Sequence, residues 1–261
     1  DYPPTISQHQ PWWPYNKLLE DYVARISQAA TIGRYAPQFL VIHPLESEYI
    51  RSDDEEEFTG SFLNLLQKLQ ESHYGYDLGD EQILADIARV KGPSLEVGAM
   101  NYQALFLPDM TGIRQTTFDL IEKFIEEGGL VFSTGRFPHY INGKMAESKL
   151  ESLEGKVIKV DMNQFSRTLS WKIKPSVVIS GKNSTNVWSS VRQVNEGTLV
   201  MLTNISHTEP SDILLETGLL RDNPVVWDPS EVKCILPYNQ VKELFDLHLD
   251  PSETIWLTSG S

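Results

Sequence analysis

Four polar residues that could hold a small molecule each follow an apolar run of the sequence closely. They are His43, Glu46, Asp109 and Arg136. An imidazole, two carboxylates and a guanidinium can bind a polar ligand if the fold gathers them in one place. Isolated carboxylates are weak evidence by themselves, so the pattern predicts a small-molecule site only if one edge of the fold collects these side chains.

A cluster of aromatic residues near the beginning of the sequence is the second candidate. Trp12, Trp13 and Tyr15 belong to the segment WWPY. Flat aromatic faces are natural platforms for the CH groups of sugars, but tryptophans that cluster are more often part of a core. Both interpretations stay open on the residues alone.

The sequence lacks the motifs of several enzyme classes. A class I glutamine amidotransferase needs a nucleophilic cysteine on a strand-to-helix turn, whereas the single cysteine, Cys234, lies inside the strand-like segment EVKCIL. We interpret Cys234 as a small buried hydrophobic residue. No GxGxxG, GxxxxGK or GxSxG motif occurs, which argues against nucleotide binding and serine hydrolysis.

Composition narrows the partners further. The 6 histidines show no HxH or HExxH spacing, so we expect neither a metal nor a cofactor. A formal net charge of -14 argues against nucleic acid, whose phosphates require a basic surface. The apolar runs are far shorter than the roughly 20 residues that span a bilayer, which argues against a membrane partner.

The segment 10–33 is predicted to contain a strongly amphipathic helix. Its apolar residues recur at helical spacing: Tyr15, Leu18, Leu19, Tyr22, Val23, Ile26 and Ala30. This spacing is typical of a helix with one buried stripe. The helix follows no strand, so we expect its packing partner to lie elsewhere and take residues 1–34 as a leading element.

Residues 35–176 alternate short apolar runs with helical patterns. Strands are predicted at 39–43, 74–78, 104–108 and 130–133, and helices at 58–69, 80–89 and 115–127, with a small hairpin at 95–102. The acidic stretch 53–57 is interpreted as a solvated helix start. Such alternation predicts a mostly parallel sheet of the flavodoxin-like or glutamine-amidotransferase-like type. Ligands of such sheets bind beyond the carboxyl ends of the strands, where the four polar residues fall.

Residues 177–261 have the pattern of an antiparallel β-sandwich. Short strands are predicted at 187–194, 198–205, 213–216, 225–227, 232–236, 242–249 and 254–258. Turn residues separate these strands, as at 195–197, and no helical period interrupts them. The predicted fold class is therefore α/β followed by β.

The succession of segments resembles one family, the α-L-rhamnosidases of glycoside hydrolase family 106. The resemblance begins with WWPY and DYVARISQAA and continues through FLVIHPLES, YDLGDEQILADIARVKGPSLEVGAMNYQALFLPDM and EEGGLVFSTG. The β-rich part adds VRQVNEGTLVMLTNIS, NPVVWDPS and LHLDPSETIWLTSGS. No single motif is diagnostic, but together these segments extend over nearly the whole chain.

The resemblance implies that a catalytic (β/α)8 barrel lies upstream and that its catalytic glutamates precede Asp1. No catalytic residue is therefore assigned in this chain. The segment 1–34 would be the last barrel helix, and Trp12, Trp13 and Tyr15 would lie at the rim of the sugar pocket.

These implications lead us to expect a non-catalytic accessory region whose carbohydrate partner is bound through the parent enzyme. The alternative is a self-standing carbohydrate-binding or oligomerisation module. Family 42 β-galactosidases carry a similar domain that mediates trimer formation, so a homo-oligomer is the further partner considered by analogy.

Overall fold

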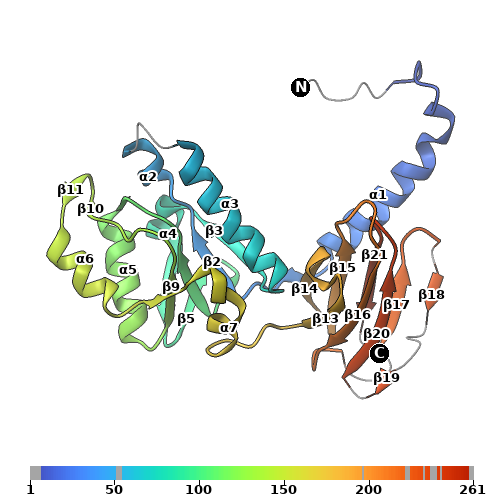
Figure 1. Cartoon of the computed structure of the whole chain (residues 1–261). Helices are drawn as coiled ribbons and strands as arrows, with labels where there is room; N and C mark the ends of the chain where they lie inside the picture. Colours follow the sequence, from blue (N-terminus) through green and yellow to red (C-terminus); the bar gives the residue numbers. More distant parts are fainter. Residues whose placement is uncertain are drawn as a thin grey trace.

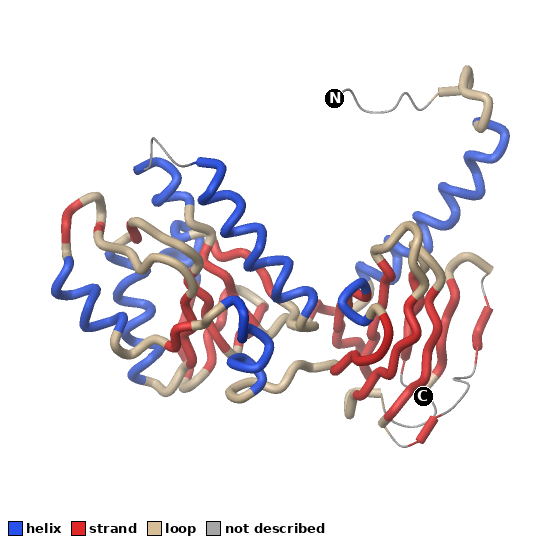
Figure 2. Tube along the Cα trace, viewed as in Figure 1, coloured by secondary structure: helices blue, strands red, loops and turns tan. Residues whose placement is uncertain are grey.

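The computed structural model describes residues 7–50, 55–195, 197–220, 224–231, 233–235, 240–241 and 243–258, without the side chains of 50, 55–58, 233–235 and 240–241. Figure 1 shows two units, and helix α1 (Asn16–Thr31) runs away from them. In Figure 2 helices surround the strands of the first unit, whereas strands dominate the second. The α/β-plus-β class predicted from the sequence is confirmed.

The first unit is built on a parallel sheet with the strand order β12-β9-β7-β2-β3. Its strands are β2 (Phe39–Ile42), β3 (Tyr76–Gly79), β7 (Ala104–Leu107), β9 (Leu130–Ser133) and β12 (Ile158–Lys159). Every residue of β2 and β7 is buried, as expected for apolar strands covered on both faces. Leu40 and Ile42 enter one hydrophobic cluster and Phe39 and Val41 another, because successive side chains of a strand point to opposite faces.

Helices cover both faces of this sheet. On the face of Phe39 lie α3 (Glu55–Glu71) and α7 (Phe165–Ser170). On the face of Leu40 lie α4 (Glu81–Ile87), α5 (Gln115–Glu126) and α6 (Glu147–Glu154). α3 begins within the predicted acidic start, of which residues 53–54 lie outside the described residues. The short α2 (Leu45–Ile50) follows β2, and η2 (Met162–Gln164) precedes α7.

Two small sheets complete the first unit. One contains β4 (Ala88–Lys91), β5 (Ser94–Val97) and β6 (Met100–Tyr102), and the other contains β8 (Gly112–Ile113), β10 (Tyr140–Ile141) and β11 (Lys144–Met145). The predicted hairpin 95–102 is confirmed.

The predicted C-terminal end of the helix 80–89 is wrong, because the helix ends two residues earlier. Asp80 caps α4 by accepting hydrogen bonds from Gln82 N and Ile83 N, but the helix stops at Ile87. Ala88 and Arg89 instead begin β4 and pair with β5. The sequence ARVK suits a helix by local propensity, but strand pairing and the burial of Ala88 in the core prevail over it.

The second unit consists of two antiparallel sheets with the orders β1-β14-β15-β21-β17-β18 and β13-β16-β20-β19. Their strands are β1 (Arg34–Tyr35), β13 (Val178–Lys182), β14 (Val187–Val194), β15 (Gly197–Asn204), β16 (Ser211–Glu216), β17 (Val225–Asp228), β18 (Lys233–Ile235), β19 (Gln240–Val241), β20 (Leu244–Leu249) and β21 (Thr254–Thr258), with η3 (Ser184–Asn186) between β13 and β14. Both sheets contribute to one hydrophobic cluster, for example through Leu202 and Leu215. Cys234 lies in β18, but its predicted burial falls outside the described side chains.

Strand β1 joins the second unit although it precedes the first unit in the chain. Arg34 and Tyr35 pair antiparallel with β14. Gly33 makes this approach possible, because it has φ +64° and a Cβ atom there would lie 2.1 Å from the carbonyl oxygen of Gln193. The chain therefore passes through the sheet of the second unit before it builds the first.

Helix α3 ends where the two units meet. Tyr74 N donates to Leu69 O and His73 N to Gln70 O, which places His73 at the left-handed position of a Schellman cap with φ 62°. This position is usually glycine, but here the imidazole is buried and lies against the backbone of Ile179 and Val187. Burial lowers the pKa of His73 to about 4, and the nearby backbone of Ile179 and Val187 offsets only part of this effect. Nδ1 of the ring has no hydrogen-bond partner among the described residues.

The predicted apolar stripe of α1 is not buried by the described part of the chain. Leu18, Leu19 and Val23 are 70%, 57% and 51% exposed, and among the residues of α1 only Asn16 and Ala29 are buried. Over the described ranges, no helix is both long enough and apolar enough to span a membrane.

Candidate functional site

In the aromatic candidate, Trp12 caps a one-turn 3-10 helix, η1 (Trp13–Tyr15), that leads into α1 (Figure 1). Trp12, Trp13 and Tyr15 are 40%, 37% and 69% exposed. The two indole rings are tilted by 48° with their centroids 6.3 Å apart. The loop therefore presents aromatic faces to solvent, and such faces can stack on an apolar partner or on the CH face of a sugar.

At the carboxyl edge of the parallel sheet, Asp109 and Arg136 form an ion pair. Arg136 Nε lies 3.1 Å from Asp109 Oδ1, and the backbone N–H of Arg136 donates to the same carboxylate. Gly135 permits this approach with φ +69°, since a Cβ atom there would lie 2.8 Å from Asp109 Cβ. The structure thus brings together two of the four residues predicted for this edge.

The other two predicted residues have different partners. Glu46 accepts from Arg114 Nε at 2.6 Å, and the His43 ring lies 5.6 Å from the ring of Phe62. Arg114 N also donates to the buried Glu81, and burial raises the pKa of this carboxyl group. The four predicted residues are therefore divided among ion pairs and packing contacts.

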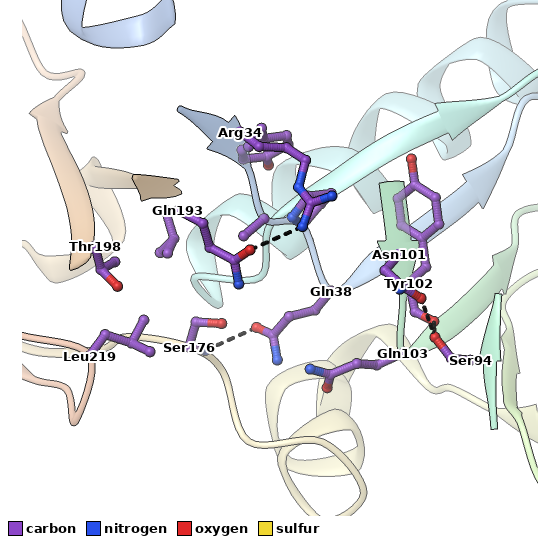
Figure 3. Close-up of a pocket in the computed structure, with 14 residues that line it drawn as sticks. Arg34, Gln38, Ser94, Asn101, Tyr102, Gln103, Ser176, Gln193, Thr198 and Leu219 are labelled. Atoms are coloured by element: carbon purple, nitrogen blue, oxygen red, sulfur yellow. Dashed lines mark hydrogen bonds between the residues drawn. The ribbon is translucent and has the colours of Figure 1, made fainter. Parts of the chain in front are cut away.

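A large cavity lies at the opposite, amino edge of the sheet, between the two units (Figure 3). Its volume is about 430 Å³. The first unit and the strand that leads into it supply Arg34, Tyr35, Ala36, Pro37, Gln38, Ser94, Asn101, Tyr102 and Gln103, and the second unit with its connector supplies Ser176, Val191, Gln193, Thr198 and Leu219.

Gln38 builds the floor of this cavity from the residue that precedes β2. Its backbone carbonyl accepts from Gln103 N and Ala104 N, which aligns β2 with β7. Its buried side chain donates to Lys174 O at 2.8 Å and accepts from Ser176 N at 2.9 Å. Gln38 thus fastens the connector between the units to the amino edge of the sheet.

Arg34 builds the opposite wall. Its Nη1 donates to Ala99 O at 2.7 Å, in the turn between β5 and β6, and its Nη2 donates to Gln193 Oε1 at 3.2 Å. This side chain therefore links β14 of the second unit to the small sheet of the first. Figure 3 shows the carboxamides of Gln103 and Gln193 in the space between these walls, whereas the carboxamide of Gln38 is turned toward Ser176.

The electrostatics of the cavity suit binding better than acid–base catalysis. Burial, with the nearby Asp77 carboxylate, raises the pKa of Tyr35 to about 12, and burial likewise raises the pKa of Tyr102, whose hydroxyl donates to Asp77. Both phenols are therefore neutral near pH 7. Among the described lining residues Arg34 is the charged one, and none is a carboxylate.

None of the residues that line this cavity was predicted as a site residue from the sequence. Gln38 and Gln103 each come directly before a buried strand, so their place at the amino edge could have been deduced. Glutamine carries no catalytic signature, however, and Gln193 reaches the site only because the two units pack together. Over the described residues, no group of histidine, cysteine and acidic side chains could hold a metal ion.

The sequence matches no protein-family model and no curated protein. The structure is similar to that of a rhamnosidase from Novosphingobium sp. PP1Y, with a TM-score of 0.68 and 17% identity over 97% of this chain and 25% of that chain. A β-galactosidase from Bacillus circulans sp. alkalophilus gives a TM-score of 0.67 and 10% identity, over 97% of this chain and 46% of that chain. An exo-carrageenase from Bacteroides ovatus gives a TM-score of 0.57 and 14% identity, over 86% of this chain and 29% of that chain.

The chain thus spans between 25% and 46% of the length of these three proteins. At such low identities the likeness shows the fold alone. The chain shares its fold with a part of several glycoside hydrolases, in agreement with the broader expectation from the sequence.

Proposed function

We propose that this chain is a non-catalytic accessory region of a carbohydrate-active enzyme, of the α-L-rhamnosidase type, and that it supports a catalytic barrel. The observation that carries the proposal is the exposed apolar face of α1, in a chain that aligns over 97% of its length with a quarter of a rhamnosidase. Residues 1–34 are taken as the last helix of that barrel.

The energetics of α1 favour a missing partner. Fully burying a leucine or valine side chain contributes roughly 1.5–3 kcal/mol. Leu18, Leu19 and Val23 lie on one face, and more than half of each is in contact with solvent. An exposed apolar patch of this kind is typical of an interaction surface.

The finer fold assignment also belongs to this proposal. Numbered along the chain, the parallel strands have the order 2-1-3-4-5, which is the flavodoxin-like order. The two antiparallel sheets share one core, which supports a β-sandwich for residues 177–261. The small-molecule site predicted at the carboxyl edge is not favoured, because Asp109 and Glu46 already hold arginine partners.

The proposal is tested by assaying the chain on aryl α-L-rhamnosides and other aryl glycosides. We expect no turnover, because the catalytic glutamates would lie outside the chain. The polypeptide encoded by the whole reading frame should contain a barrel upstream of Asp1 and should hydrolyse such a substrate. Robust turnover by the chain alone would refute the non-catalytic role.

The exposed aromatic loop favours a second candidate function, a self-standing carbohydrate-binding or oligomerisation module. Trp12, Trp13 and Tyr15 would then be its contact residues. This candidate predicts a stable oligomer in light scattering, or calorimetric binding of rhamnose or galactose that Trp13→Ala weakens. A monomer without such binding would eliminate it.

A further inference from the structure

The cavity between the two units leads to an inference that is independent of the accessory role. We propose that it binds a small neutral saccharide through the carboxamides of Gln103 and Gln193, one from each unit. The cavity lies at the amino edge of the parallel sheet, apart from the aromatic loop and from the ion pairs of the carboxyl edge.

The charges around the cavity select a neutral ligand. The described lining residues include no carboxylate that would attract a cation, and both tyrosine hydroxyls are uncharged. Arg34 is the charged lining residue, and each of its terminal nitrogens donates one hydrogen bond to a wall, to Ala99 O and to Gln193 Oε1. These two bonds direct the guanidinium toward the walls, so we expect a neutral ligand, with an anion as the alternative that the test includes.

The polar groups of the cavity match hydroxyls. A carboxamide both donates and accepts hydrogen bonds, as a sugar hydroxyl does, so the two groups complement each other in either direction. Gln103 is exposed, and over the described residues its side chain makes no hydrogen bond. Gln193 uses its oxygen to accept from Arg34, which leaves its NH2 group as a donor toward the cavity.

The apolar part of the lining suits the CH face of a sugar ring. Pro37, Val191 and Leu219 contribute aliphatic surface beside the ring of Tyr35. A volume of about 430 Å³ lies within the roughly 300–1,000 Å³ of small-molecule sites. Aliphatic walls with a few convergent polar groups are the usual composition of such sites.

The competing explanation for the cavity is a cleft between the two units that holds only water. A substitution of Gln38 would not distinguish the two explanations. Its carboxamide hydrogen-bonds Lys174 and Ser176, so the loss of this side chain would disturb the structure. Gln103 and Gln193 are better suited because their side chains are exposed. Gln193→Ala also removes the hydrogen bond from Arg34 Nη2, but Arg34 keeps its bond to Ala99 O, and Gln103→Ala breaks no hydrogen bond between described residues. Gln28, exposed on α1 and outside the cavity lining, provides a matched control.

The test is a titration of the 15N-labelled chain with L-rhamnose and with D-galactose, followed through the side-chain NH2 signals in NMR spectra. The signals of Gln103 and Gln193 are assigned by their loss in Gln103→Ala and Gln193→Ala. We expect saturable shifts of both signals with at least one sugar. Either substitution should raise Kd roughly three- to tenfold, the effect of one lost hydrogen bond, and Gln28→Ala should leave it unchanged.

Three outcomes would overturn the proposal. Shifts that grow linearly with sugar concentration, like those caused by glycerol at the same concentration, would indicate a water-filled cleft. Equal affinity in the parent chain and both cavity variants would place the binding elsewhere. Binding of D-galacturonate, with neither neutral sugar bound, would show that Arg34 is available to an anion. The hydrolase assay is unaffected by these results, so the two proposals can fail separately.

Discussion

The buried His73 predicts a specific dependence of stability on pH. The residue is 8% exposed, and burial lowers its pKa from 6.5 to about 4. Because the folded state disfavours the charged ring, stability is complete above pH 6.5 and is lost as the pH falls toward 4. A shift of this size corresponds to about 3 kcal/mol at 1.36 kcal/mol per pKa unit.

The perturbation is His73→Asn. Asparagine tolerates the left-handed backbone that His73 adopts, with φ 62°, and it does not titrate. At pH 7 the variant should be somewhat less stable, because it loses the packing of the imidazole between the units. The parent chain should lose about 3 kcal/mol relative to the variant as the pH falls to 4.

The assay is urea unfolding of both chains at several pH values between 7.5 and 4, the range that covers both pKa values. The control is His9→Asn, which removes an exposed histidine near the beginning of the described residues. Its stability should follow that of the parent chain at every pH. A constant difference between His73→Asn and the parent chain over this range would refute the assignment of the buried neutral ring.

Three further predictions follow from named contacts. Burial raises the pKa of Glu81, so its ionised form destabilises the folded chain above that pKa. Glu81→Gln should therefore increase the free energy of unfolding at pH 7, and this increase should vanish at acid pH in the same urea assay. Leu19→Ala should change the unfolding free energy of this chain by less than ~0.5 kcal/mol, whereas Leu65→Ala in the core should cost ~2–5 kcal/mol; equal losses in thermal unfolding would contradict the exposed face of α1. The pKa of His248 is raised chiefly by its hydrogen bond with Asp212, so the pair stabilises the fold below the unfolded pKa of 6.5 and loses this effect as the pH rises. His248→Asn should therefore be slightly destabilising at pH 6 and neutral at pH 9. An NMR titration that finds no rise in the pKa of His248 would contradict this prediction.

The sequence was most informative where one physical signal dominated. The apolar runs at 39–42 and 104–107 indicate strands buried on both faces, and these strands form the centre of the sheet. β12 was missed because it has only two residues, one of them the exposed Lys159. β4 was missed because its residues also suit the end of a helix, and only pairing with β5 decides between the two.

The candidate site was less predictable for a related reason. Charged residues after strands drew attention to the carboxyl edge, but sequence cannot show that Asp109 and Arg136 neutralise each other. The cavity depends on uncharged amides that come together only when the two units meet. Gln38 and Gln193 belong to distant segments, and no local pattern relates them.

The entry of β1 into the second unit changes how the chain can be divided. Because β1 precedes the first unit and β13 follows it, the first unit is an insertion within the chain of the second unit, which acts as its β-sheet host. Its two ends touch, since Gln38 hydrogen-bonds Lys174 and Ser176. A short peptide could therefore bridge the ends and leave a continuous host, whereas a domain boundary drawn after β1 would separate an edge strand from that host. An insertion with adjoining ends can also be lost or exchanged as a single piece.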